Sequence, residues 1–239
     1  MGLHIEANKN QEAAFSSMLK SLAVSIGAID ALFHIDLAEP EVWLGKSWLK
    51  CLKRRESIFF TSHYLEDTFQ RYRSRLKSAD KELTKSVNKQ LYNWPSSSTP
   101  SGRIIKENGY RTVVSVSISL PSCSELSGRF LFFFDNYNEQ CEFDIRQSVE
   151  NVLNEMFVYQ AAVSSSQLIT SPLEDYGMLK KSTISIIRHL AQGCSRKELS
   201  NIHYMTPRGI DYHLERAKYL LGAKNMHHLV YKSQSLLLI

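Results

Sequence analysis

Two capped helix starts near the C-terminus constrain the fold of this chain more than any other feature. Ser195 and Glu198 have the spacing of a capping box, in which each side chain bonds a backbone amide at the start of a helix. Thr206 precedes Pro207, and proline suits the first helical position because its missing N–H would have no partner there. Starts eleven residues apart leave room for a short helix, a turn and a second helix. The pattern predicts a helix-turn-helix.

The second of these helices has two different faces. Apolar residues recur at helical spacing along one side, which predicts a face that packs on a core: Ile210, Leu214, Ala217 and Leu221. The other side carries Arg208, Asp211, Tyr212 and Arg216. An ordinary solvated surface would also explain this polar side. However, further short helices are predicted before Gly193 and after Gly222, and four short helices in about sixty residues are typical of a DNA-binding domain.

Basic residues are concentrated in the same region. Residues 176–239 include ten basic and three acidic side chains, whereas the whole chain has a net charge of +5. The preceding residues are therefore slightly acidic as a group. Because phosphate neutralisation requires clustered lysine and arginine, the distribution indicates double-stranded DNA as a partner of the C-terminal segment.

Residues 186–199, 205–213 and 219–225 resemble the LuxR-type DNA-binding domain. The resemblance implies that the helix beginning at Thr206 enters the major groove, while the helix containing Lys197 braces it against the DNA backbone. Three positions depart from the family pattern, where a glutamate, a threonine and a lysine are replaced by Thr183, Gly209 and Leu220.

Position along the two helices separates the expected DNA contacts into two groups. Exposed residues in the first turns of a recognition helix reach deepest into the groove, so base-edge contacts are expected from Arg208, Asp211 and Tyr212. Phosphate contacts are expected from Arg196, Lys197, Thr206, Arg216 and Lys218.

The chain is long enough for two domains, with 239 residues and 43% hydrophobic content. We expect an α+β sensory and dimerisation domain at 1–165, a linker at 166–175 and the helix-turn-helix domain at 176–239. Strands of an antiparallel sheet are predicted at 28–35, 57–62, 112–120 and 129–134, and helices at 11–26, 64–78 and 81–92.

A longer helix is predicted at 142–163, where no proline or glycine interrupts the apolar spacing. It either packs against its own sheet or pairs with the same helix of a second subunit. A homodimer is favoured for a helix-turn-helix, because two half-sites add their binding energies.

The N-terminal region resembles the ligand-binding domain of LuxR-type quorum-sensing receptors in the order of its elements and in residues 109–114. In that family a tyrosine, two tryptophans and an aspartate surround an acyl-homoserine lactone. The resemblance assigns the tyrosine, the aspartate and one tryptophan to Tyr64, Asp80 and Trp94, and places Tyr72 at a second aromatic position. Thr68 stands in place of the tryptophan that donates to the lactone carbonyl.

Losing that donor costs about 1–3 kcal/mol if the carbonyl is buried. We therefore expect a small, mostly apolar signal, either an acyl-homoserine lactone or a related non-standard ligand. The alternative is a ligand-independent dimeric regulator with a vestigial pocket, controlled by its own concentration or by a protein partner.

Other classes of protein find little support in the sequence. It has no glycine-rich phosphate loop, no Gly-x-Ser-x-Gly elbow and no His-Glu-x-x-His pair, so we expect neither an enzyme nor a cofactor. The aspartates Asp30, Asp36 and Asp135 do not form the pattern of a phosphorylated receiver domain. No metal site is expected from the four cysteines, and the absence of a signal peptide or membrane span indicates a cytoplasmic protein. The basic run Lys50–Arg55, beside Trp43 and Trp48, is expected to be an exposed amphipathic segment.

Overall fold

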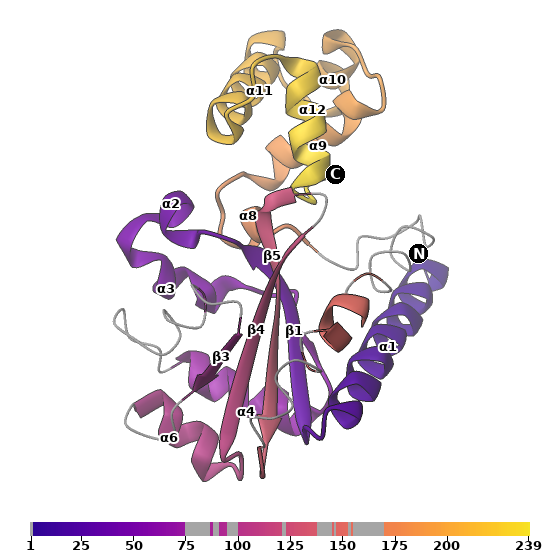
Figure 1. Ribbon diagram of the computed structural model, residues 1–239. Coiled ribbons are helices and arrows are strands. Elements are labelled where there is room, and N and C mark those ends of the chain that lie inside the picture. The colour runs from indigo at the N-terminus through magenta and orange to yellow at the C-terminus, as the bar shows by residue number, and fades with distance from the viewer. Residues whose placement is uncertain are drawn as a thin grey trace. The chain divides into compact units, whose positions relative to one another are not determined.

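The computed structural model divides the chain into two compact units, Met1–Leu168 and Ile169–Ile239, which are treated separately below. The first is α+β and the second consists of helices (Figure 1). The residues that the structure describes are 2–74, 87, 91–94, 100–120, 123–137, 145, 147–152, 154 and 170–239.

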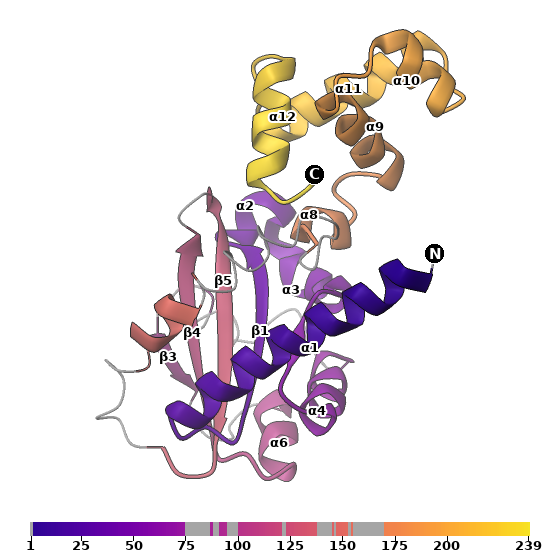
Figure 2. The ribbon, with the colours of Figure 1, turned by 90° about the vertical axis from the view of Figure 1, so that its right-hand side faces the viewer.

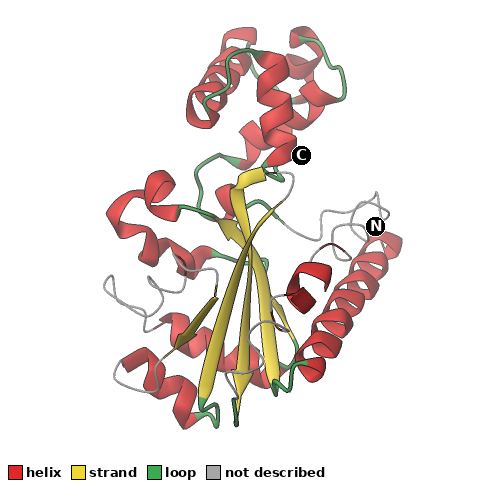
Figure 3. Ribbon diagram, in the orientation of Figure 1, coloured by secondary structure: helices red, strands yellow, loops and turns green. Residues whose placement is uncertain are grey.

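A five-stranded antiparallel sheet forms the centre of the first unit, and the sequence predicts its antiparallel arrangement and four of its strands. Its strands are β1 (Asp30–Leu37), β2 (Phe59–Phe60), β3 (Leu91–Trp94), β4 (Thr112–Leu120) and β5 (Cys123–Phe134). They are arranged in the order β2-β1-β5-β4-β3, seen in yellow in Figure 3. The β1–β5 pairing runs from Asp30 opposite Phe133 to Leu37 opposite Leu126. This continuous register fixes which side chains share each face of the sheet.

Helices of the first unit are α1 (Gly2–Ser25), α2 (Pro40–Leu44), α3 (Trp48–Cys51), α4 (His63–Ser74) and α6 (Pro100–Glu107), with 3-10 turns η1 (Gly45–Ser47) and η2 (Leu52–Arg54). The second unit contains α8 (Pro172–Asp175), α9 (Lys181–Ala191), α10 (Arg196–Ile202), α11 (Pro207–Leu221) and α12 (Met226–Ser235). None of the described helices combines the length and apolar character that crossing a membrane requires.

One face of the sheet is apolar and is covered by α1, which runs diagonally across the sheet in Figure 2. Phe15 of α1 is fully buried, with its ring 5.2 Å from that of Phe59. Phe33 of β1 and Phe130 of β5 pack across the central pair at 4.6 Å. Alternate strand residues point to one face, so the aromatic positions of β5 separate cleanly into this core and the opposite side.

The opposite face packs on α4 and α6 through a second core, which contains Leu65, Tyr72, Ile105 and Phe133. Asp30 is buried at one edge of this core. Its carboxylate accepts hydrogen bonds from the Tyr110 hydroxyl and from the Thr61 hydroxyl, each at 2.7 Å. Burial and the Asp30 carboxylate raise the pKa of Tyr110 far above its usual value, so its phenol remains a donor.

Several sequence predictions need correction. The helix predicted at 81–92 is wrong at residues 91–92, which belong to β3 because Leu91 and Tyr92 pair with β4. Residues 172–175, assigned from sequence to the linker, form α8 with Pro172 and Leu173 buried. Most of the predicted 142–163 helix lies outside the described residues, although 147–152 are helical.

The basic run Lys50–Arg55 is amphipathic, as the sequence indicates, with Lys50, Lys53 and Arg54 exposed, but Arg55 is buried. Trp48 is 2% exposed and donates its indole N–H to Glu41 at 3.1 Å. Arg55 is 1% exposed, because its guanidinium reaches the backbone of β1. Only part of the run, including Lys53 and Arg54, faces solvent.

Replacing Tyr110 with Phe removes one of the two hydroxyl donors to the buried Asp30 carboxylate. We expect the free energy of unfolding of the first unit to fall by about 1–3 kcal/mol, because a buried acceptor loses its donor. Urea denaturation followed by tryptophan fluorescence measures this loss, since Trp43, Trp48 and Trp94 all belong to this unit.

Tyr64→Phe is the matched control, because the Tyr64 hydroxyl bonds Asn108 at an exposed position. We expect this control to change the stability by less than about 0.5 kcal/mol. Equal losses for the two variants would show that the Tyr110–Asp30 bond has no special role.

Candidate functional site

The α10–α11 pair of the second unit begins with the two caps that the sequence predicts. The Ser195 hydroxyl accepts from the Glu198 amide at 3.3 Å, and the Glu198 carboxylate accepts from the Ser195 amide at 2.7 Å. The hydrogen bond from the Ser195 backbone amide, followed by an interaction with the Ser195 hydroxyl, lowers the pKa of Glu198. The Thr206 hydroxyl accepts from the Gly209 amide at 3.1 Å. Both starts are therefore fixed locally, and a four-residue turn separates the two helices.

The apolar face of α11 is completely buried in the second unit. Ile210, Leu214 and Ala217 are 0% exposed, and Leu199 of α10 is also 0% exposed. The α11 helix contacts α9, α10 and α12. Because this face is held by three helices, the opposite face of α11 is fixed toward solvent in this unit.

That outward face carries the polar residues predicted from the sequence: Arg208, Asp211, Tyr212 and Arg216 are all exposed. Arg216 donates to the Tyr212 hydroxyl at 3.3 Å, which orders the two side chains on successive turns. Lys197 of α10 is exposed as well. Among the described residues, Lys197, Arg208 and Arg216 form no ion pair.

Two other predicted basic residues already have acidic partners. The Arg196 guanidinium lies 2.9 Å from the Asp211 carboxylate and so connects α10 to α11. Lys218 lies 3.0 Å from Glu215 within α11. Ion pairs at such exposed positions contribute only about 0–1 kcal/mol to stability, so an incoming phosphate could replace either carboxylate at small cost.

Tyr204 is a surface residue that the sequence analysis missed. It lies in the turn before α11, its side chain is 96% exposed and its φ is 51°, an uncommon value for a residue with a side chain. Tyrosine hydroxyls commonly contact phosphate in protein–DNA interfaces. An aromatic residue inside a short turn between two capped helices was the available sequence signal.

Two histidine contacts connect the helices behind this face. His213 of α11 bonds the Thr183 hydroxyl of α9 at 2.7 Å, and His189 bonds His203 at 3.1 Å. Burial, followed by the charges of Lys180 and Arg216, lowers the pKa of His213. Burial, followed by His189 and His213, lowers the pKa of His203. Both shifts favour the neutral imidazoles, and Thr183 has a defined partner in His213.

These lowered pKa values predict that the second unit loses stability in mild acid. The folded state resists protonation of His203 and His213, so the unfolded state binds more protons below the ordinary histidine pKa of 6.5. The stabilisation is present above that pH and is lost as the pH falls. We expect a lower urea midpoint at pH 5.5 than at pH 7.5, measured from the amide NMR signals of α9 and α11.

The double variant His203→Gln and His213→Gln should reduce this pH dependence. His63→Gln is the control, because the His63 side chain is fully exposed and lies in the first unit. An unchanged pH dependence in the double variant would rule out these histidines as its source.

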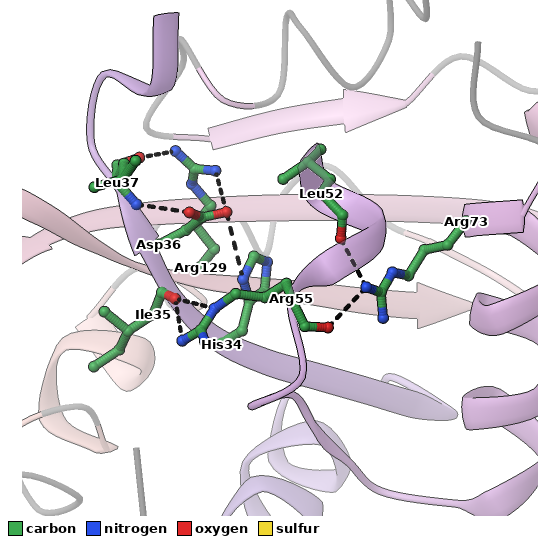
Figure 4. Close-up of polar contacts among 8 residues, drawn as sticks. All are labelled: His34, Ile35, Asp36, Leu37, Leu52, Arg55, Arg73 and Arg129. Atoms are coloured by element: carbon green, nitrogen blue, oxygen red, sulfur yellow. Dashed lines mark hydrogen bonds and ion pairs between the residues drawn. The ribbon is translucent and has the colours of Figure 1, made fainter. Parts of the chain in front are cut away.

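The first unit has a second polar site on the sheet face beneath α4. The strand registers place His34 of β1 opposite Arg129 of β5, and Arg129 opposite Ser117 of β4, in one row across three strands. Neighbouring positions place Asp36 beside this row, 3.3 Å from the Arg129 guanidinium (Figure 4). Arg129 also donates to the Leu37 carbonyl.

The segments η2 and α4 cover this row and are hereafter called the wall. Two more buried arginines hold the wall in place (Figure 4). Arg55 donates to the Ile35 carbonyl through two nitrogens, at 3.0 and 2.8 Å. Arg73 of α4 donates to the carbonyls of Leu52 and Arg55, each at 2.7 Å. These bonds connect α4, η2 and β1 through backbone acceptors.

A cavity of about 40 Å³ lies between this wall and the sheet. Its lining includes His34, Arg129 and Ser117 on the sheet side, and Phe69, Tyr72 and Arg73 on the α4 side. Burial lowers the pKa of His34 to about 3, against the opposing effect of Asp36, so its imidazole is neutral. Within the described residues, Arg129 Nε and His34 Nδ1 lack a hydrogen-bond partner. Each such buried atom costs about 1–3 kcal/mol.

The ligand residues implied by the family resemblance are only partly together. Tyr72 lines the cavity, and its ring lies 6.1 Å from that of Trp94. Trp94 donates to the Ser115 hydroxyl at 3.3 Å, and Ser115 lines the same cavity. Thr68 is 1% exposed and does not line the described cavity.

Two further expected ligand residues lie elsewhere. Tyr64 is 53% exposed and its hydroxyl bonds Asn108. Asp80 lies outside the described residues. His34 and Arg129 were not predicted from the sequence, where their only signal was a polar residue beside a phenylalanine in a strand.

The fold and these sites define a protein of two units. The α+β unit contains a cavity that is polar at one end, and the helical unit has an exposed basic face. No family model matches the chain, and no curated protein matches it.

Solved structures similar to this chain include the following three. One is Escherichia coli SdiA, with 14% identity over 95% of this chain and 92% of that chain and a TM-score of 0.49. SdiA in complex with octanoyl-rac-glycerol has 12% identity over 98% and 95%, with a TM-score of 0.48. The phage VqmA–DPO complex has 15% identity over 92% and 89%, with a TM-score of 0.23. At such low identities, function has to be inferred from this chain's own residues.

Proposed function

We propose that this protein is a transcription regulator of the LuxR type, in which α10 and α11 form a helix-turn-helix and α11 enters the major groove of DNA. The observation that carries the proposal is the division of α11 into two faces. Ile210, Leu214 and Ala217 are 0% exposed, while Arg208 and Arg216 face solvent. A recognition helix needs this arrangement, because it must be braced from behind while its polar side chains reach the bases.

In this proposal, Arg208, Asp211 and Tyr212 contact base edges, and Arg196, Lys197, Thr206, Arg216 and Lys218 contact phosphates. The Thr206 hydroxyl accepts its cap bond and keeps its own proton for donation to a phosphate oxygen. Arg196 is held at 2.9 Å by Asp211, so the two side chains are positioned together before DNA arrives.

We further propose a homodimer on a two-fold symmetric operator, because one recognition helix contacts few base pairs. In this proposal the first unit controls DNA binding by binding a small and mostly apolar signal in the cavity beneath α4. An acyl-homoserine lactone or a related molecule fits the family resemblance.

The alternative is a ligand-independent regulator controlled by its own concentration or by a protein partner. The observation that favours it is the small cavity of about 40 Å³, which holds only a few waters.

Lys197→Ala tests the phosphate contacts. Lys197 is exposed and belongs to the bracing helix, so its loss should weaken binding to all DNA sequences about equally. The slope of log K against log salt should fall by about 1. Fluorescence anisotropy with a labelled duplex at several salt concentrations measures both quantities. Lys20→Ala is the matched control, because Lys20 is an exposed lysine in the first unit.

Asp211→Ala tests the base contacts. We expect a change in the preferred base at one operator position, with discrimination altered by about 1–3 kcal/mol. Selection from a randomised operator pool measures the preference. Glu215→Ala is the control, since Glu215 is also an exposed acid of α11, paired with Lys218. An unchanged preference in Asp211→Ala would show that the proposed docking register is wrong.

A further inference from the structure

We propose that the cavity in the first unit recognises a small carboxylate with an apolar body, through Arg129 Nε and His34 Nδ1. The inference rests on the proposed function, because it names the chemistry of the signal that the first unit would bind.

The sheet face beneath α4 changes from apolar to polar along the strands. The row containing Asp30, Phe133 and Val113 belongs mainly to the apolar core. Two residues along each strand, Leu32 and Leu131 are apolar and Ser115 of β4 is the one polar residue of the row. The following row contains His34, Arg129 and Ser117. A ligand bound along this gradient would have an apolar body and one polar end.

The polar end offers hydrogen-bond donors. Arg129 is 5% exposed and uses Nη1 and Nη2 on Asp36 and Leu37, while Nε has no hydrogen-bond partner among the described residues. An arginine nitrogen can only donate, so Nε requires an acceptor. His34 Nδ1 is 3.8 Å from Asp36, beyond hydrogen-bond distance, and can donate in the appropriate tautomer.

A carboxylate matches these donors better than a neutral head group does. It is purely an acceptor, and its two oxygens can serve Arg129 and His34 together. A guanidinium N–H forms a stronger hydrogen bond with a carboxylate than with a neutral carbonyl. The Nε donor of Arg129, which is unused within the described residues, therefore favours an anion over a lactone or an amide. Phe69, Tyr72 and Leu131 line the same cavity and would contact the apolar body.

The cavity of about 40 Å³ is smaller than such a ligand. Binding therefore requires the wall formed by α4 and η2 to move away from the sheet, and part of the binding energy is used in that movement. Waters on Arg129 and His34 would be the alternative occupants of the closed cavity.

Three probes that share one acyl chain test the head group: octanoate, octanamide and N-octanoyl-homoserine lactone. We expect isothermal titration calorimetry with the full chain, without DNA, to give octanoate a Kd at least tenfold lower than that of octanamide or the lactone. Equal affinities, tighter binding of the lactone, or no octanoate binding up to 1 mM would overturn the proposal.

Arg129→Lys tests the contact itself, because lysine keeps the charge facing Asp36 but removes the Nε donor. We expect at least a tenfold loss of octanoate affinity. Arg111→Lys is the matched control, since Arg111 also pairs with a carboxylate, Asp135 at 3.0 Å, but has an exposed side chain. Wild-type affinity in Arg129→Lys would overturn the proposal.

Two further measurements cover the case in which Arg129→Lys fails to fold. Octanoate should shift the Nε–H NMR signal of Arg129 in the wild-type chain, and Ser117→Leu should abolish binding by filling the cavity. An unmoved Arg129 signal or unchanged Ser117→Leu affinity would overturn the proposal. Because no DNA is present, failure here leaves the Lys197→Ala test intact, and loss of DNA binding leaves the octanoate result intact.

Discussion

The pairing of β1 with β5 is the constraint on which the first unit depends. Its continuous register fixes two opposite sets of side chains, one facing α1 and the other facing α4. A slip of β1 by one residue would turn Phe33 toward the polar cavity and His34 and Asp36 into the apolar core. The cost of burying those groups without partners makes such a slip prohibitive. The row of His34, Arg129 and Ser117 therefore lines the cavity and also helps to specify the strand register.

The buried arginines of the first unit donate hydrogen bonds mainly to backbone carbonyls. Arg55 and Arg73 bond the carbonyls of Ile35 and Leu52, so each connects segments that pack in different layers. Arg129 instead meets Asp36 at 3.3 Å and retains an unused Nε donor in the described surroundings. The second unit is organised differently, because its polar groups are caps and surface side chains. In the proposed roles, stability and recognition are combined in one arginine of the first unit but separated onto two faces of α11.

Local features of the structure were predictable from the sequence, and long-range ones were not. The caps at Ser195 and Thr206 depend on residues three positions away, so the sequence predicts both helix starts correctly. Alternation along residues 112–120 predicts β4 because period two directly reflects burial on a sheet. The helical spacing at 91–92 was misleading, since pairing of Leu91 with Val116 places these residues in a strand.

The contacts of the charged residues around the cavity are also long-range and could not be predicted from the sequence. Arg55 looked like a surface residue because its acceptor, the Ile35 carbonyl, is distant in sequence and leaves no mark in composition. The contact of Arg129 with Asp36 depends on sheet register in the same way. Selection of binding sites by the full-length protein from a random duplex pool at about 0.15 M salt tests the central claim most directly. The account predicts enrichment of one motif with two-fold symmetry. Retention of all sequences equally, or no retention at all, would contradict it.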